Sequence, residues 1–136
     1  MFEQLSRKAI GAITSEAQSQ GHAVCISIVD SAGLLRGFLR MDGAVAGAID
    51  VAVKKARTAA LFGTNSAALG QQAQPGGAIY SLEATNGGMI SFGGGIVLRD
   101  KNGDILGAVG VAGATVALDE AFARAGAATA NAAVRG

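Results

Sequence analysis

The sequence is poor in the residues that build metal centres, disulfides and aromatic stacking surfaces. It has one cysteine, one histidine, one tyrosine and no tryptophan in 136 residues. A single cysteine excludes an internal disulfide framework and the usual structural zinc sites. A single histidine excludes a histidine-rich metal centre. The shortage of aromatic rings argues against stacking on nucleic-acid bases.

Charged residues are scarce as well. They make up 15% of the chain, and 11 basic residues against 10 acidic ones give a formal net charge of +1. This balance argues against a nucleic-acid partner held by phosphate neutralisation. The small number of charged residues also leaves few polar side chains to cover the surface of a monomer. We therefore expect a homo-oligomer, either a dimer or a larger assembly.

Long hydrophobic runs are missing from the sequence. No stretch reaches the roughly 18 apolar residues that a membrane span needs. The first residues show no basic leader followed by an apolar run, so we expect a cytoplasmic protein without a membrane partner. The length suits one domain over residues 1–136, which can bury a core without metals or disulfides.

Glycine and small apolar residues are abundant, with 21 glycines and 50% hydrophobic residues. Apolar periodicity and turn residues predict alternating helices and hairpins, an α+β domain with an antiparallel sheet. We expect helices at 2–17, 44–62, 65–72 and 119–134, and strands at 23–29, 34–40, 96–98 and 105–111. Residues 71–88 lack periodicity and form a long loop of the kind that is usually functional or mobile.

Three glycines at a regular spacing lie in the last predicted strand and at its exit. Glycines within a strand mark the close approach of another backbone or of a ligand. Gly107, Gly110 and Gly113 therefore indicate either tight packing or a ligand-facing floor.

Two cations are the best candidates for a shared anion-binding pocket. Arg40 ends a strand, where its guanidinium can bind a carboxylate with two hydrogen bonds, although a local pair with Asp42 is equally compatible with the sequence. Lys55 belongs to the group Lys54, Lys55 and Arg57 on the long helix, which is either an anion site or a solvated face.

Three blocks of sequence together resemble the GlcG/HbpS family, which includes the C-terminal domain of PduO-type proteins. They are residues 26–33 (ISIVDSAG), residues 40–44 (RMDGA) with 55–59 (KARTA), and residues 93–96 (GGGI) with 103–113 (GDILGAVGVAG). The resemblance implies a profilin-like α/β/α sandwich with a central antiparallel sheet of about five strands. It also implies homo-oligomers, and members that bind haem or corrinoid-type tetrapyrroles or serve catabolic operons.

Three functions remain open from the sequence. In the first, the chain binds haem or a corrinoid, with His22 as axial ligand and propionates on Arg40 or on the Lys54–Arg57 group that includes Lys55. The macrocycle then lies over a glycine- and alanine-lined surface that includes Gly94 and Gly95. In the second, it is an enzyme acting on a small organic acid, and Asp42, Tyr80 or Glu83 transfers a proton. In the third, it is a structural oligomer without a ligand.

Overall fold

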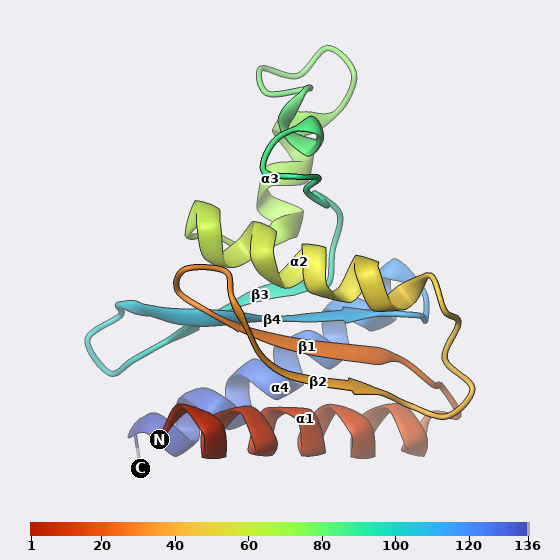
Figure 1. Cartoon of the computed structure of the whole chain (residues 1–136), viewed down its shortest axis with the longest axis vertical. Coiled ribbons are helices and arrows are strands. Elements are labelled where there is room, and N and C mark those ends of the chain that lie inside the picture. Colours follow the sequence, from red (N-terminus) through yellow and green to blue (C-terminus); the bar gives the residue numbers. More distant parts are fainter. Residues whose placement is uncertain (136) are drawn as a thin grey trace.

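The structure, a computed structural model, describes residues 1–135 and places helices on both faces of one antiparallel sheet (Figure 1). The elements follow the order helix, hairpin, two helices, hairpin, helix. Their bounds are α1 Phe2–Ser19, β1 Cys25–Asp30, β2 Leu35–Arg40, α2 Ala48–Phe62, α3 Ser66–Ala73, the short 3-10 helix η1 Leu82–Ala84, β3 Gly95–Arg99, β4 Ile105–Ala112 and α4 Val116–Arg135.

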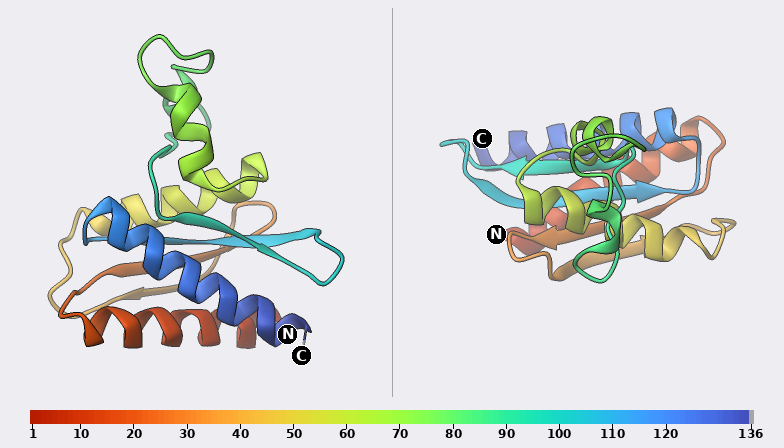
Figure 2. Two further views of the ribbon diagram at one scale, coloured as in Figure 1. Left: turned by 180° about the vertical axis from the view of Figure 1, so that it is seen from behind. Right: turned by 90° about the horizontal axis from the view of Figure 1, so that it is seen from above.

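The sheet joins the two hairpins through their inner strands. Its order is β2-β1-β4-β3, and every neighbouring pair is antiparallel. α1 and α4 cover one face, whereas α2 covers the other (Figures 1 and 2). This is the α+β sandwich that the sequence predicts.

The same turn chemistry closes both hairpins. The Asp30 carboxylate accepts hydrogen bonds from the backbone N–H groups of Ala32 and Leu34, and Gly33 takes a positive φ of 78°. In the second hairpin, the Asp100 carboxylate likewise accepts from two backbone N–H groups of its turn, and Gly103 takes a positive φ of 84°. An aspartate that bonds forward to its own turn favours a tight reversal, which explains why both hairpins are readable from the sequence.

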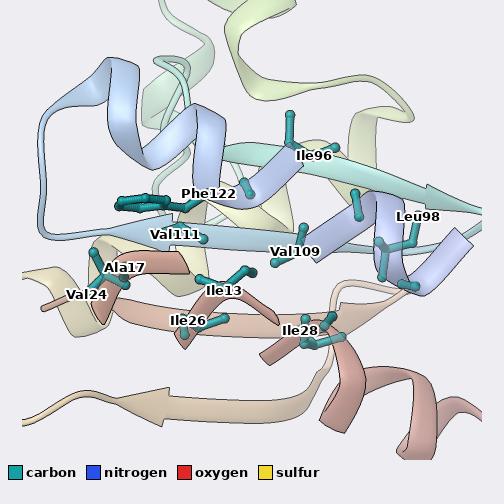
Figure 3. Packing of buried hydrophobic residues seen from close by; sticks show 14 of the residues in the cluster. Ile13, Ala17, Val24, Ile26, Ile28, Ile96, Leu98, Val109, Val111 and Phe122 are labelled. Carbon is teal, nitrogen blue, oxygen red and sulfur yellow. The ribbon is translucent and has the colours of Figure 1, made fainter. Parts of the chain in front are cut away.

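The two faces of the sheet carry side chains of very different size. The face toward α1 and α4 buries a cluster of large apolar residues that includes Ile26, Ile28, Val109, Val111 and Phe122 (Figure 3). The face toward α2 carries smaller side chains, and there Ala108, Gly110 and Ala112 of β4 pack against the alanines of α2. Because small residues add little thickness, α2 lies almost directly on the backbone of the sheet.

The sheet has four strands in the described part of the chain, which corrects the expected number of about five. The stretch before β3 does not add a strand, and several of its backbone N–H groups donate to side chains rather than to a neighbouring strand. The Thr58 hydroxyl accepts from Ile90, the Glu83 carboxylate from Ser91, and the Glu120 carboxylate from Gly94.

Residues 64–90 form an arm that rises from the α2 side of the molecule, away from the sheet (Figures 1 and 2). It contains α3 and η1. In α3 only Ser66 is buried, and η1 has no buried residue. The irregular stretch expected at 71–88 is therefore mostly exposed within the arm.

Candidate functional site

A cavity of about 470 Å³ opens between the end of α1 and the end of β2; we call it the His22 hollow. Its lining includes Gln18, His22, Leu39, Arg40, Met41 and Asp42. The register of the sheet explains this grouping, because Cys25 at the start of β1 pairs with Arg40 at the end of β2. The loop before β1 and the turn after β2 therefore meet at the open end of this hairpin.

His22 is half-buried in this hollow. Its ring lies 6.2 Å from the ring of Phe122, centroid to centroid, in a tilted arrangement. Within the described residues, its ring nitrogens make no hydrogen bond to the protein. An imidazole that is held by packing and has an unbonded ring nitrogen can act as a ligand to a metal ion or to haem iron.

Arg40 supplies a cation to the same hollow. Its Nε and Nη2 donate to the backbone carbonyl of Ala44, at 3.2 and 3.0 Å. This bond to the turn replaces the local pair with Asp42 that the sequence left open, since the described residues show no ion pair between Arg40 and Asp42. A guanidinium has five N–H donors, so donors remain for an anion.

Lys55 lies elsewhere, beneath α2. Its side chain is 1% exposed, and Nζ donates to the Val111 carbonyl at 2.9 Å and to Asp119 Oδ2 at 3.2 Å. The Phe92 ring covers the ammonium, with Nζ 4.9 Å from the ring centroid. Burial away from water lowers the pKa of Lys55, and the neighbouring Asp119 carboxylate opposes this change.

A second cavity, of about 380 Å³, adjoins this lysine; we call it the Lys55 hollow. Its lining includes Val45, Val51, Lys55, Phe92, Val116 and Asp119. It shares no lining residue with the His22 hollow.

The structure therefore does not bring Arg40 and Lys55 into one anion-binding pocket, as the sequence led us to predict. The reason is the helical position of Lys55. It lies on the same side of α2 as Ala48, Ala52 and Ala59, the side that packs on the sheet. The other two cations of the group do not join Lys55. Lys54 pairs with Asp50 at 2.9 Å, and Arg57 donates to the carbonyl of Asn86.

Gly94 and Gly95 contact Lys55 and do not line the His22 hollow. A Cβ on Gly94 would lie 2.7 Å from Lys55 Nζ, and a Cβ on Gly95 would meet the Lys55 carbonyl. Their N–H groups donate to Glu120 and to the Ser66 hydroxyl. Both glycines thus let the start of β3 pack closely against α2.

The residues proposed for proton transfer are not assembled into one group. Glu83 lies in the arm and accepts hydrogen bonds from the Ser91 N–H and hydroxyl, at 2.9 and 2.7 Å. Tyr80 is also in the arm and is 57% exposed. Asp42 lines the His22 hollow instead. No hydrogen bond joins any two of these three within the described residues.

The partnership of Lys55 with Asp119 and Phe92 was missed by the sequence reasoning. In the sequence, Asp119 stands at the start of the helix expected over residues 119–134, where an acid is favoured by the helix dipole without any particular partner. The available signal was the alanine stripe of α2, on which a lysine interrupts the side that must face the sheet. A buried lysine needs an acidic partner, but the sequence does not say which acid supplies it.

Comparison with known proteins identifies the family. The family model described as "Haem degrading protein HbpS-like" matches residues 3–128. The chain belongs to the HbpS-like family. This confirms the resemblance found in the sequence blocks.

Individual known proteins are similar along most of the chain. An uncharacterized 15.0 kDa protein from the dhaT-dhaS intergenic region of Citrobacter freundii is 34% identical, over 87% of this chain and 83% of its own length. The corrinoid adenosyltransferase PduO of Salmonella typhimurium is 35% identical over the same share of this chain, but only 34% of PduO is matched. The crystal structure of a PduOC–haem complex superposes with a TM-score of 0.88 at 32% identity, covering 93% of this chain and 91% of that one.

Proposed function

We propose that this HbpS-like chain binds haem, or a related tetrapyrrole such as a corrinoid, in the His22 hollow. The observation that carries the proposal is the meeting of His22 with Arg40 in one cavity, where the His22 imidazole makes no hydrogen bond to any of the residues that the structure describes. The haem complex of PduOC supports the choice of ligand. The hollow is within the usual volume range of small-molecule sites, about 300–1,000 Å³.

The residues of the hollow fit the chemistry of haem. His22 would hold the iron through a ring nitrogen, and the free N–H donors of Arg40 would bind a propionate. Leu39 contributes an apolar wall for the macrocycle. When bound, haem would supply a redox-active iron. Met41 also lines the hollow, but it is buried and its sulfur accepts a hydrogen bond from the N–H of Val24 at 3.5 Å, so His22 is the better placed ligand for the iron.

A haemin titration of the purified protein, followed by visible absorbance, tests the proposal. The wild type should give a saturable shift of the Soret band. His22→Ala should change the position of that band, because the axial ligand is lost. Arg40→Ala should weaken binding by about tenfold to a hundredfold, which corresponds to a charge-assisted hydrogen bond of roughly 1.5–3 kcal/mol.

Arg36→Ala is the matched control. Arg36 lies on the same strand as Arg40 but does not line the His22 hollow. Its guanidinium carbon lies 4.6 Å from the centroid of the Phe2 ring instead. It should bind haemin like the wild type. A wild type without a Soret shift would contradict the function. An unchanged spectrum for His22→Ala would contradict the axial ligand.

A further inference from the structure

We propose that Lys55 is a covalent site for a small carbonyl compound, an aldehyde or ketone that enters the Lys55 hollow and forms a Schiff base with Nζ. This site is separate from the tetrapyrrole site. It rests on a lysine amine that is buried at the wall of an apolar cavity and that the proposed function does not use.

The Lys55 hollow has walls that suit a short hydrocarbon chain. Val45, Phe92 and Val116 line it, and they are 64%, 44% and 49% exposed. Apolar side chains so open to solvent form an accessible mouth, whereas the amine lies at the buried end. A small molecule with a hydrocarbon tail and a polar head therefore matches both ends of the cavity.

The surroundings of Nζ suit an amine that reacts with carbonyls. Lysines that form Schiff bases are activated by burial, which disfavours the ammonium form. Lys55 is buried, and this burial lowers its pKa. The Asp119 carboxylate lies 3.2 Å from Nζ and can accept its proton. Phe92 covers the amine and must move aside for the ligand.

The reaction balances without any further reagent. The Lys55 ammonium gives a proton to Asp119, and the neutral amine then attacks the carbonyl carbon to form a C–N bond. The C=O π bond breaks as the C–N bond forms, and one proton of the attacking nitrogen passes to the carbonyl oxygen, which becomes the hydroxyl of a neutral carbinolamine. Asp119 returns its proton to this hydroxyl, which leaves as water, and the nitrogen lone pair forms the C=N bond. The product is a protonated imine, whose positive charge pairs with Asp119 as the ammonium did.

Reductive trapping tests the proposal with a defined probe. The folded protein is incubated with butanal and sodium cyanoborohydride, and the alkylated lysines are quantified by peptide mass spectrometry. The neighbouring Lys54 is the internal control, because it is paired with Asp50 at the outer side of α2 and is more exposed. We expect Lys55 to be alkylated about tenfold faster than Lys54, equivalent to about 1.4 kcal/mol in the barrier.

A purely structural lysine gives the opposite order, since a buried amine would be the slowest to react. Alkylation of Lys55 at or below the rate of Lys54 in the folded wild type overturns the proposal. Unfolding in urea should abolish the preference, because both lysines are then solvated. A preference that persists in urea would also overturn it, since the hollow would not be its cause.

Two variants test the role of the surrounding residues without removing the lysine. Phe92→Ala uncovers Nζ and should accelerate alkylation of Lys55 severalfold while leaving Lys54 unchanged. Asp119→Asn removes the carboxylate that stabilises the Lys55 ammonium, so the alkylation of Lys55 should begin at a lower pH than in the wild type. Circular dichroism confirms folding, and an unchanged pH profile in the folded variant would overturn the coupling of the two groups on which the proposal rests. If Phe92→Ala fails to accelerate Lys55, the hollow is not the route of entry, and the proposal fails.

Discussion

Two buried serines have opposite hydrogen-bonding states. Ser27 on β1 donates from its hydroxyl to the carbonyl of Ala52 at 2.7 Å and thereby joins the sheet to α2. Ser6 on α1 is 4% exposed, and within the described residues its hydroxyl is the one buried side-chain polar atom without a partner. A buried polar group stabilises a fold only when it is bonded.

Replacing each serine by alanine should therefore change stability in opposite directions. Ser27→Ala leaves the Ala52 carbonyl without this hydrogen bond and should lower the free energy of unfolding by about 1–3 kcal/mol. Ser6→Ala removes an unpaired hydroxyl and should leave it unchanged or raise it by about 1 kcal/mol. Urea unfolding of the two variants measures the difference. Equal losses would contradict the assignment of the Ser6 hydroxyl as unbonded.

The ion pair of Lys55 and Asp119 makes a second prediction at the scale of residues. Lys55→Met leaves the Asp119 carboxylate, 5% exposed, without its cation, and should cost about 3–5 kcal/mol of stability. Asp119→Leu should cost a similar amount. The double variant should lose clearly less than the sum, because no buried charge is left unpaired. Strict additivity in urea unfolding would show that the pair is not coupled.

The candidate residues near His22 were predictable because they are close in sequence to the ends of paired strands. A hairpin brings the start of its first strand next to the end of its second, so a residue just before β1 and one at the end of β2 lie at the same end of the sheet. Lys55 and Asp119 come from different helices, and their meeting depends on how α2 and α4 lie against β4. That long-range packing has no local signal, so the shared pocket of Arg40 and Lys55 was a wrong prediction.

At the scale of elements, α2 and β4 pack so closely that no side chain fits between them at Gly110. A Cβ on Gly110 would collide with the carbonyl of Ala52 and lie 2.7 Å from the backbone nitrogen of Ala56. Backbone atoms cannot turn aside as a side chain can. The glycine spacing in the sequence left packing and a ligand floor open, and at Gly110 the structure shows packing.

Gly110→Ala should therefore destabilise the protein by roughly 1–3 kcal/mol or more, and Gly110→Val by more still. Gly11→Ala is the matched control, because Gly11 lies within α1 with nothing within 4 Å of the added methyl group. There the change should stabilise the helix by up to about 1 kcal/mol. Thermal unfolding compares the two. A melting temperature unchanged in Gly110→Ala would refute the close contact.

Helices and hairpins were predictable wherever local chemistry sets them. Gly63 ends α2 with a positive φ of 67°, as a helix-ending glycine should. The start of α2 was placed too early, at residue 44, because the apolar residues before Ala48 form turns that periodicity cannot distinguish from helix. The arm was predicted only in part, as a short helix at 65–72 and an irregular stretch at 71–88, since a contact such as that of Ile90 with Thr58 joins residues far apart in the sequence.

At the scale of the whole molecule, large apolar side chains remain on the surface. Phe62, Tyr80 and Phe92 are 41%, 57% and 44% exposed, and the arm leaves most of its own residues uncovered. Apolar surface of this extent, on a chain with 15% charged residues, is typical of subunits that associate. No helix in the described part of the chain has the length and apolar character to cross a bilayer.

We accordingly expect a homo-oligomer in solution. Multi-angle light scattering over a dilution series should give a mass above that of one 13.4 kDa chain. Phe62→Lys and Tyr80→Lys should shift the equilibrium toward smaller species, because a charge would be buried at the interface. A monomer at micromolar concentration would remove the argument.

The strand order has a consequence for the synthesis of the protein on the ribosome. β1 lies in the middle of the sheet, yet one of its two neighbours, β4, is made only after α2, α3 and β3. At a translation rate of roughly 5–20 residues per second, the nascent first hairpin waits several seconds with the backbone N–H and C=O groups along one edge of β1 unpaired. During that interval an unpaired strand is open to pairing with a neighbouring nascent chain. The nascent chain therefore has its greatest need of a chaperone before β4 leaves the exit tunnel, and slow codons between the two hairpins would lengthen that exposure.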